Sequence, residues 1–266
     1  MNEALDSLKG QPPRFVWHAF VKEQQTLAYN KDKSEAVMNA SDKCFLSMDF
    51  AENYTCLHQD EIQSAHWRQR HVTLYTVMAY NREEKIPMVI ASDCLDHDKN
   101  SVTAFTVAAL NKVLSAWPCI KRISIWTDGP TSQFKNKFVF NLLKQLASTL
   151  DVQITWNFSA TSHGKGPNDA LGGNVKAIAR RSVMTRKFVV RDAASFVSAV
   201  ASSGCNIKIF SVSSDDFDAL KTEVGVTEKF WTKCTAFPGI MNTHCVLIKN
   251  QEIRLKYYTL VSEYMD

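Results

Sequence analysis

The sequence lacks the features of a membrane-spanning, secreted or repetitive protein. No apolar stretch approaches the roughly 20 residues that a transmembrane helix needs. The first residues are polar and partly acidic, unlike a secretory signal, and no repeat or low-complexity tract is present. The net charge is only +4, so the overall electrostatic field of the chain does not by itself indicate a nucleic-acid partner. Local clusters of positive charge would have to attract such a partner.

Paired cysteines are also missing. The chain has seven cysteines, an odd number, and they stand singly without any Cys-x-x-Cys pair. Such a set is typical of reduced thiols in a cytosolic or nuclear protein. We therefore expect a soluble intracellular chain with no membrane partner. The cysteines are Cys44, Cys56, Cys94, Cys119, Cys205, Cys234 and Cys245.

The length and composition allow one large domain and a smaller unit. With 266 residues, 45% of them hydrophobic, the chain can bury a full core. Residues 1–42 are polar and helical in character, with a break at Pro12 and Pro13, and we expect an N-terminal arm that packs onto the main domain. Residues 43–187 form the predicted main domain, and residues 188–266 form a predicted small α/β appendage.

Apolar periodicity in the main domain predicts three strands followed by a helix, a strand, a helix, a strand and a helix. Runs rich in Val, Ile, Thr and Tyr indicate the strands, and apolar residues at helical spacing indicate the helices. The predicted strands are 44–50, 71–80, 86–92, 120–125 and 152–158, and the helices are 102–114, 138–146 and one from about Asn168. The appendage is predicted to hold a helix at 193–203, a strand at 206–212, a short helix after Ser214 and a hairpin of 243–249 with 252–259.

This order of elements is that of a ribonuclease-H-like fold, a mixed five-stranded sheet with helices on both faces. In that topology the first and fourth strands are parallel neighbours. Asp49 and Asp128 would then emerge at the same carboxyl edge, where open sheets place their ligands. The third helix, entered through a glycine-rich turn, crosses that edge and carries Asp169 toward the pair.

Three carboxylates at one sheet edge indicate phosphodiester chemistry. Cleavage needs an activated nucleophile and a stabilised leaving oxygen, and two divalent cations about 3.5–4 Å apart provide both. Carboxylate oxygens suit Mg²⁺ or Mn²⁺. We predict that Asp49 bridges two such ions, that Asp128 binds one and that Asp169 binds the other. The alternative is that they are ordinary strand-end or surface acids, although a half-buried Asp49 is unfavourable without compensation.

Three other groups near this edge have two interpretations each. Glu52 is either a neighbour of the metals or a loop charge. Asp93, at the end of the third strand, is expected near 10 Å from Asp49, which favours a structural or substrate-edge role. His163 precedes Asp169 and is a candidate catalytic residue that protonates the leaving group or contacts a phosphate, and the alternative is a hydrogen-bonded loop histidine.

Basic residues cluster around the third helix. Lys176 and Arg180 come seven and eleven positions after Asp169, which is close to whole turns of a helix. The three residues therefore share one helix face, along which a phosphate backbone could run. The alternative is a solvated basic helix. The candidate nucleic-acid-binding residues are Lys135, Lys165, Lys176, Arg180 and Arg181.

Four segments of the sequence resemble transposon-derived proteins that carry a ribonuclease-H-like DDE/DDD transposase core. The resemblance covers roughly residues 43–182. It implies Mg²⁺-dependent cleavage and joining of DNA, with Asp49, Asp128 and Asp169 in the acid positions, and hence a nuclear protein that works as a homo-oligomer. The segments are Met48–Tyr54, Gln59–Trp67, Thr127–Gly129 with Ser132–Asn136, and Ala160–Pro167.

The chain departs from the transposase pattern in two respects. A glycine is expected directly after the third acid, whereas here Gly172 and Gly173 come later. No zinc finger or helix-turn-helix is recognisable before residue 43, which indicates a truncated or host-retained copy. Two alternatives therefore stay open. One is a catalytically silent scaffold that binds DNA or protein, and the other is a general nuclease that needs only phosphate contacts.

Overall fold

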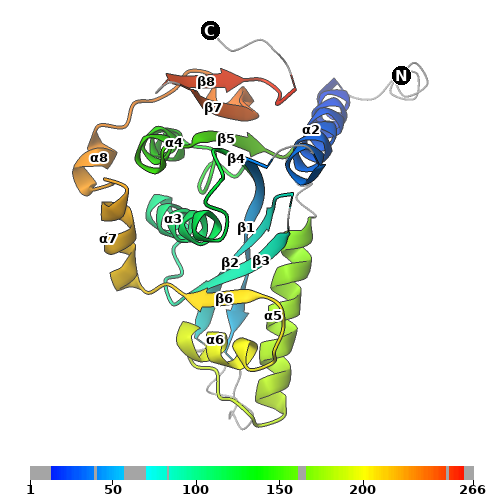
Figure 1. Cartoon of the computed structure of the whole chain (residues 1–266), viewed down its shortest axis with the longest axis vertical. Helices are drawn as coiled ribbons and strands as arrows, with labels where there is room; N and C mark the ends of the chain where they lie inside the picture. The colour runs from blue at the N-terminus through cyan, green and yellow to red at the C-terminus, as the bar shows by residue number, and fades with distance from the viewer. Residues whose placement is uncertain are drawn as a thin grey trace.

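The structure is a computed structural model that describes residues 13–38, 41–56, 70–82, 84–160, 166–249 and 252–260. In these ranges the chain forms both helices and strands (Figure 1). The helices are α2 (Pro13–Met38), α3 (Lys99–Ala116), α4 (Lys137–Leu150), α5 (Pro167–Met184), α6 (Ala193–Ala201), α7 (Ser214–Glu223), α8 (Glu228–Thr232) and the 3-10 helix η2 (Ile240–Asn242). The strands are β1 (Lys43–Thr55), β2 (His71–Tyr80), β3 (Lys85–Ser92), β4 (Arg122–Thr127), β5 (Gln153–Phe158), β6 (Lys208–Ser211), β7 (Cys245–Lys249) and β8 (Glu252–Lys256).

The centre of the sheet has the strand order of the ribonuclease-H-like fold. The described strands form an eight-stranded sheet in the order β6-β3-β2-β1-β4-β5-β7-β8. β1, β2 and β3 pair as an antiparallel meander, and β4 and β5 follow β1 in parallel. The fold class predicted from the sequence is confirmed.

The C-terminal part of the chain extends both edges of this same sheet. β6 pairs in parallel with β3, while β7 pairs antiparallel with β5 and β8 with β7. Residues predicted as a small appendage therefore contribute strands to the central sheet. The division of the chain at residues 42 and 187 stays a prediction.

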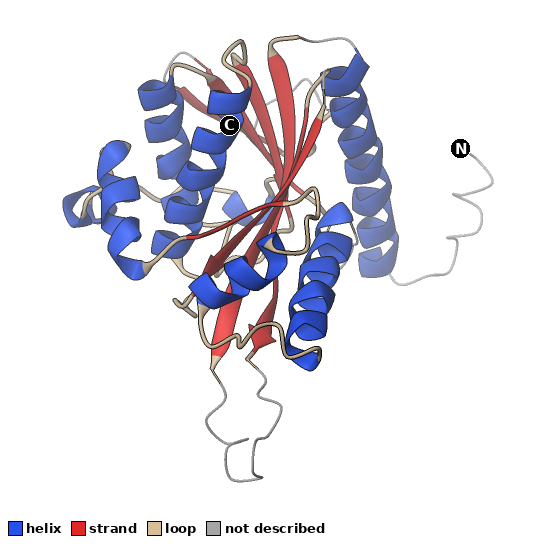
Figure 2. Cartoon of the chain, turned by 60° about the horizontal axis from the view of Figure 1, so that its bottom comes forward, coloured by secondary structure: helices blue, strands red, loops and turns tan. Residues whose placement is uncertain are grey.

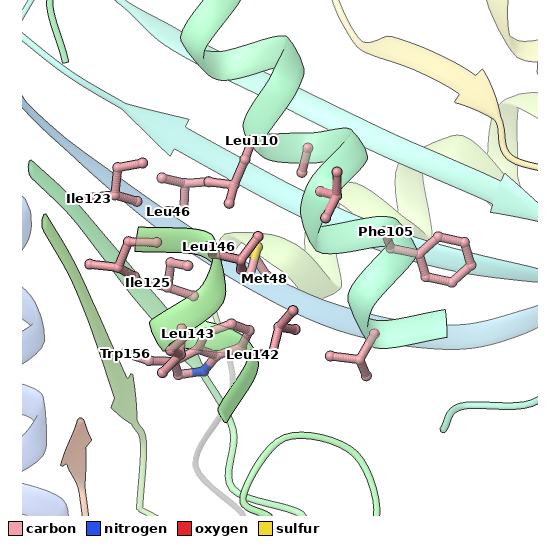
Figure 3. Packing of buried hydrophobic residues seen from close by; sticks show 14 of the residues in the cluster. Leu46, Met48, Phe105, Leu110, Ile123, Ile125, Leu142, Leu143, Leu146 and Trp156 are labelled. Atoms are coloured by element: carbon pink, nitrogen blue, oxygen red, sulfur yellow. The ribbon is translucent and has the colours of Figure 1, made fainter. Parts of the chain in front are cut away.

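Helices cover both faces of the sheet. α3 and α4 pack on one face, with α7 outside α3, and α2, α5 and α6 pack on the other (Figures 1 and 2). On the first face, alternate residues of β1 and β4 pack against leucines of α4 (Figure 3). Leu46, Met48 and Ile125 are among these core residues, and each is at most 1% exposed. Because side chains alternate along a strand, Ser47 and Asp49 lie on the opposite face, toward α2 and α5.

α2 is held on its face of the sheet mainly by polar contacts. Asp32 accepts hydrogen bonds from Lys43, Ser124 and the Trp126 indole nitrogen, which lie on β1 and β4. Gln25 is buried, and its amide donates to the Phe158 carbonyl at 2.8 Å. These bonds make α2 a fixed layer beside the carboxyl ends of the strands.

None of the described helices is long and apolar enough to cross a bilayer. All seven cysteines lie in the described ranges, and each is a free thiol.

Gly172 allows α5 to approach β1 closely. A Cβ atom at Gly172 would lie 2.8 Å from the Ala51 Cβ, whereas at Gly173 it would meet nothing within 4 Å. We therefore expect Gly172→Ala to reduce the free energy of unfolding by about 1–3 kcal/mol, because the two elements have to separate. Gly173→Ala is the matched control and should stabilise the chain by roughly 0.5–1 kcal/mol, because alanine favours the helix. Urea unfolding of both variants decides the matter, and equal effects would contradict the close approach.

Candidate active site

Asp49 and Asp128 lie next to each other at one level of the sheet. The parallel pairing of β1 with β4 ends at Ser47 opposite Trp126, and each aspartate comes two residues later on its own strand. Both side chains therefore point to the face that carries α2 and α5. β1 continues to Thr55, so Asp49 lies within the strand and not at its end as the sequence predicts.

The two carboxylates are half-buried and affect each other electrostatically. Burial, followed by the charges of Asp128 and Asp169, raises the pKa of Asp49 to about 7. Burial and the charge of Asp169 raise the pKa of Asp128 to about 6. All three predicted acids are thus close enough to repel one another. Such raised pKa values are common where carboxylates share a functional site.

A pocket of about 270 Å³ opens beside these acids, between α2 and the first turn of α5. Asp49, Asp128 and Asn168 line it. Asp128 Oδ1 and Asn168 Oδ1 are buried and have no hydrogen-bond partner in the structure. Buried oxygen atoms without partners are energetically unfavourable. A ligand that donates hydrogen bonds or carries positive charge would compensate these two atoms.

The donor set fits a hard divalent cation. Asp49 and Asp128 offer carboxylate oxygens, Asn168 adds an amide oxygen, and Asp128 Oδ1 has no hydrogen-bond partner. Asp169 is exposed in the first turn of α5 and is not among the residues that line the pocket. Within the described ranges, no three His, Cys, Asp or Glu side chains lie close enough together to hold one ion.

The raised pKa values predict a pH dependence of stability without metal. Between about pH 4 and 7 the folded chain holds protons on Asp49 and Asp128 that the unfolded chain releases, so stability falls as the pH rises through this window. Asp49→Asn combined with Asp128→Asn should remove this loss, on the order of 2 kcal/mol after allowance for solvent screening. Melting temperatures in EDTA at pH 5 and pH 8 test it. A difference between wild type and variant that does not change with pH would contradict it.

One protein-family model matches most of the chain. Residues 25–259 match the model of a family described as a domain of unknown function (DUF8701). The chain belongs to this family. The matched region of the DUF8701 domain begins inside α2 and ends after β8, so it includes every strand of the sheet. A search of curated proteins finds none that matches the sequence.

The DUF8701 domain also shows a distant likeness to solved structures. The human cytomegalovirus terminase nuclease domain has 12% identity and a TM-score of 0.30, over 73% of this chain and 84% of that chain. An Mn-soaked structure of the same nuclease domain has 10% identity and a TM-score of 0.30, over 73% and 82% of the two chains. The similar structures are thus nuclease domains.

The predicted basic residues of the DUF8701 chain lie in different surroundings. The ammonium of Lys176 lies 3.2 Å from the carboxylate of Glu52. Glu52 therefore forms an ion pair with one of the predicted nucleic-acid-binding residues. Arg180 and Arg181 are exposed on α5. Lys135 is buried, burial lowers its pKa to about 8, and its ammonium donates to the Met241 carbonyl at 2.8 Å.

The remaining predicted residues have simple outcomes. His163 and Lys165 lie outside the described residues. Asp93 accepts a hydrogen bond from the Ala193 backbone nitrogen at 2.8 Å and so caps the start of α6. Asp93 therefore has a structural role, because it holds the start of α6.

Sequence reasoning missed Asn168 and the whole α2 side of the pocket. Asn168 lines the pocket, and its Nδ2 donates to the Ser47 hydroxyl at 3.0 Å. The sequence Pro167-Asn168-Asp169 at the start of α5 could have indicated Asn168, because it places an amide side chain next to the predicted metal ligand Asp169. On α2 the missed pocket-lining residues are Lys22, Gln25, Thr26, Tyr29, Asn30 and Lys33. Their four- and three-residue spacing is a helical stripe, but it is polar and therefore gives no apolar signal.

Proposed function

We propose that this chain is a metal-dependent nuclease that breaks phosphodiester bonds in nucleic acid, with Asp49, Asp128 and Asp169 as the metal-binding carboxylates. One observation carries the proposal. Asp49 and Asp128 lie side by side at neighbouring parallel strands, burial and nearby carboxylate charge raise the pKa of both, both line one pocket, and the buried Asp128 Oδ1 has no hydrogen-bond partner. A structural role would be expected to satisfy that oxygen within the protein.

Each residue has a defined part in this chemistry. A bound Mg²⁺ or Mn²⁺ pair would lower the pKa of the attacking water and offset the charge that grows on the leaving oxygen. Asp49 on β1 and Asp128 after β4, at the centre of the sheet, would hold the cations together with Asp169. Near neutral pH Asp49 carries a proton for part of the time, so binding of the cations has to release it. Asn168 orients the start of α5 through Ser47.

The finer form of the proposal is DNA cleavage and strand transfer of the transposase type. Its support is the resemblance of residues 43–182 and the coincidence of the three acids with the expected positions. We include in it a DNA substrate, a nuclear location and an assembly of more than one copy. His163 is the proposed proton donor to the leaving group.

The test combines metal binding with cleavage. The purified chain is incubated with end-labelled DNA and RNA in Mg²⁺, Mn²⁺ or EDTA, and its melting temperature is measured in the same buffers. Metal at 100 times its Kd should stabilise the chain by about 2.7 kcal/mol, or roughly 5–10 °C. Shortened DNA supports the nuclease, and joined DNA products support strand transfer. Equal cleavage of RNA favours a general nuclease, and a folded chain with neither cleavage nor stabilisation would be a binding scaffold.

A further inference from the structure

α2 forms a wall of the pocket opposite the acids. Lys22, Thr26, Asn30 and Lys33 line the pocket from this helix, at intervals of four, four and three residues that place them on one face. Polar side chains thus run along the pocket for about three turns of helix. The acids and the lysines belong to different walls of the same space.

The two lysines bring positive charge that no carboxylate in the described ranges neutralises. Among the described residues, neither Lys22 nor Lys33 has a carboxylate within ion-pair distance. The ammonium of Lys33 lies 3.9 Å from the centre of the Tyr80 ring, which holds it without removing its charge. Lys22 is exposed at the mouth of the pocket.

The third wall is also suited to an anion. α5 is an 18-residue helix that starts at Pro167, and its N-cap residue Gly166 provides no side-chain hydrogen bond. Pro167 has no N–H group, and among the described residues no side chain accepts a hydrogen bond from the other backbone N–H groups of this first turn, where the helix dipole favours negative charge. Gly166 and Pro167 line the pocket together with Lys22 and Lys33.

α2 is a fixed wall and not a movable lid. Asp32 binds β1 and β4, and Gln25 binds the Phe158 carbonyl and both the backbone nitrogen and the hydroxyl of Thr259. The pocket of about 270 Å³ lies at the lower end of the range for small-molecule sites. Space of that size suits one nucleotide unit, which favours a single strand over a duplex in the pocket.

We propose that Lys22 and Lys33 of α2, facing the start of α5, hold the phosphates of a single nucleic-acid strand whose scissile bond lies at Asp49 and Asp128. The inference rests on the proposed nuclease function and names its substrate form. Lysine contacts to phosphate carry no sequence information, so they position a strand of any sequence. Both lysines are positioning residues for the strand, while the acids carry the chemistry.

Binding without metal separates this inference from the proposed function. A fluorescently labelled single-stranded DNA and the corresponding duplex are titrated with the full chain in EDTA at several salt concentrations. Lys22→Ala with Lys33→Ala should weaken single-strand binding and reduce the slope of log K against log salt by about 1.4, or about 0.7 for each lost phosphate contact. Lys31→Ala is the matched control, because Lys31 is an exposed lysine of α2 that does not line the pocket.

Each result has a definite meaning. Binding that depends on Lys22 and Lys33 but is followed by no cleavage in Mg²⁺ supports the strand site and overturns the nuclease. Cleavage by the wild type with a salt slope unchanged in the double variant, or equal to that of Lys31→Ala, overturns the strand site and leaves the nuclease. Duplex bound as tightly as single strand overturns the single-strand assignment, and absence of any binding overturns the inference. Equal melting temperatures of the variants show that they are folded.

Discussion

Asp128→Asn is expected to lower metal-dependent cleavage by more than about 100-fold, because replacement of groups that merely support metal ligands already costs 10–100-fold. The substitution keeps the shape of the side chain and removes its charge. Asp128 Oδ1 has no hydrogen-bond partner, so the change breaks no bond to that atom within the protein. The variant should therefore be at least as stable as the wild type in EDTA at pH 8, where the buried charge of Asp128 is unfavourable.

Asp93→Asn is the matched control for this experiment. Asp93 also follows a strand of the sheet, but its carboxylate caps α6 at the Ala193 nitrogen. This variant should keep its cleavage rate and its metal-induced rise in melting temperature. The rate of cleavage of labelled DNA in Mg²⁺, with melting curves in EDTA, gives both readings. If Asp128→Asn and Asp93→Asn cleave equally well, Asp128 is not a metal ligand.

Asp32→Ala is expected to reduce the free energy of unfolding by about 3–5 kcal/mol, the range for a buried ion pair that loses one partner. Lys43 lies 2.5 Å from Asp32, and its side chain is only 9% exposed. The Trp126 indole nitrogen, 2.7 Å from Asp32, and the Ser124 hydroxyl would lose their acceptor at the same time. Glu35 still contacts Lys43 at 3.0 Å, which places the loss within this range and not above it.

Lys121→Ala provides the comparison for Asp32→Ala. Lys121 pairs with Asp151 at 3.4 Å, and both side chains are largely exposed, at 63% and 96%. Loss of such a surface pair costs less than about 1 kcal/mol. Urea unfolding of both variants measures the difference. A loss below about 1 kcal/mol for Asp32→Ala would show that α2 is not anchored through this carboxylate.

The central sheet could be predicted from the sequence because its strands and helices space their apolar residues differently. The strands are short, nearly continuous apolar runs, whereas the helices have apolar residues at intervals of three and four. The runs 71–80 and 86–92 coincide with β2 and β3 to within one residue. The helix predicted at 193–203 is α6, which Asp192 caps, with Ser195 completing the reciprocal bond. The neighbours of β6 and β7 could not be predicted, because periodicity reports which residues are buried and not which edge of a sheet receives them.

Of the acids that the sequence singles out, Asp49 and Asp128 line the pocket and Asp169 does not, and Asn168 and the α2 wall were missed, for geometric reasons. Neighbouring residues on a helix point about 100° apart, so the residue at which α5 begins decides that Asn168 turns inward and Asp169 outward. Sequence spacing alone does not fix that residue to within one position. α2 is attached through Gln25 and Asp32, whose partners lie up to 234 residues away, and no local pattern announces such bonds.

The pairing of distant segments also determines when this chain can complete its fold. β3 pairs with β6 across 120 residues, from Met88 to Lys208, and Gln25 of α2 bonds to Thr259 near the other end of the chain. Contacts of such separation slow folding, because loop entropy is lost before the contacts form. During synthesis α2 cannot form its bonds to Thr259 until the chain through that residue has left the ribosome. The α2 wall of the pocket is thus fixed late, by a residue that does not itself line the pocket.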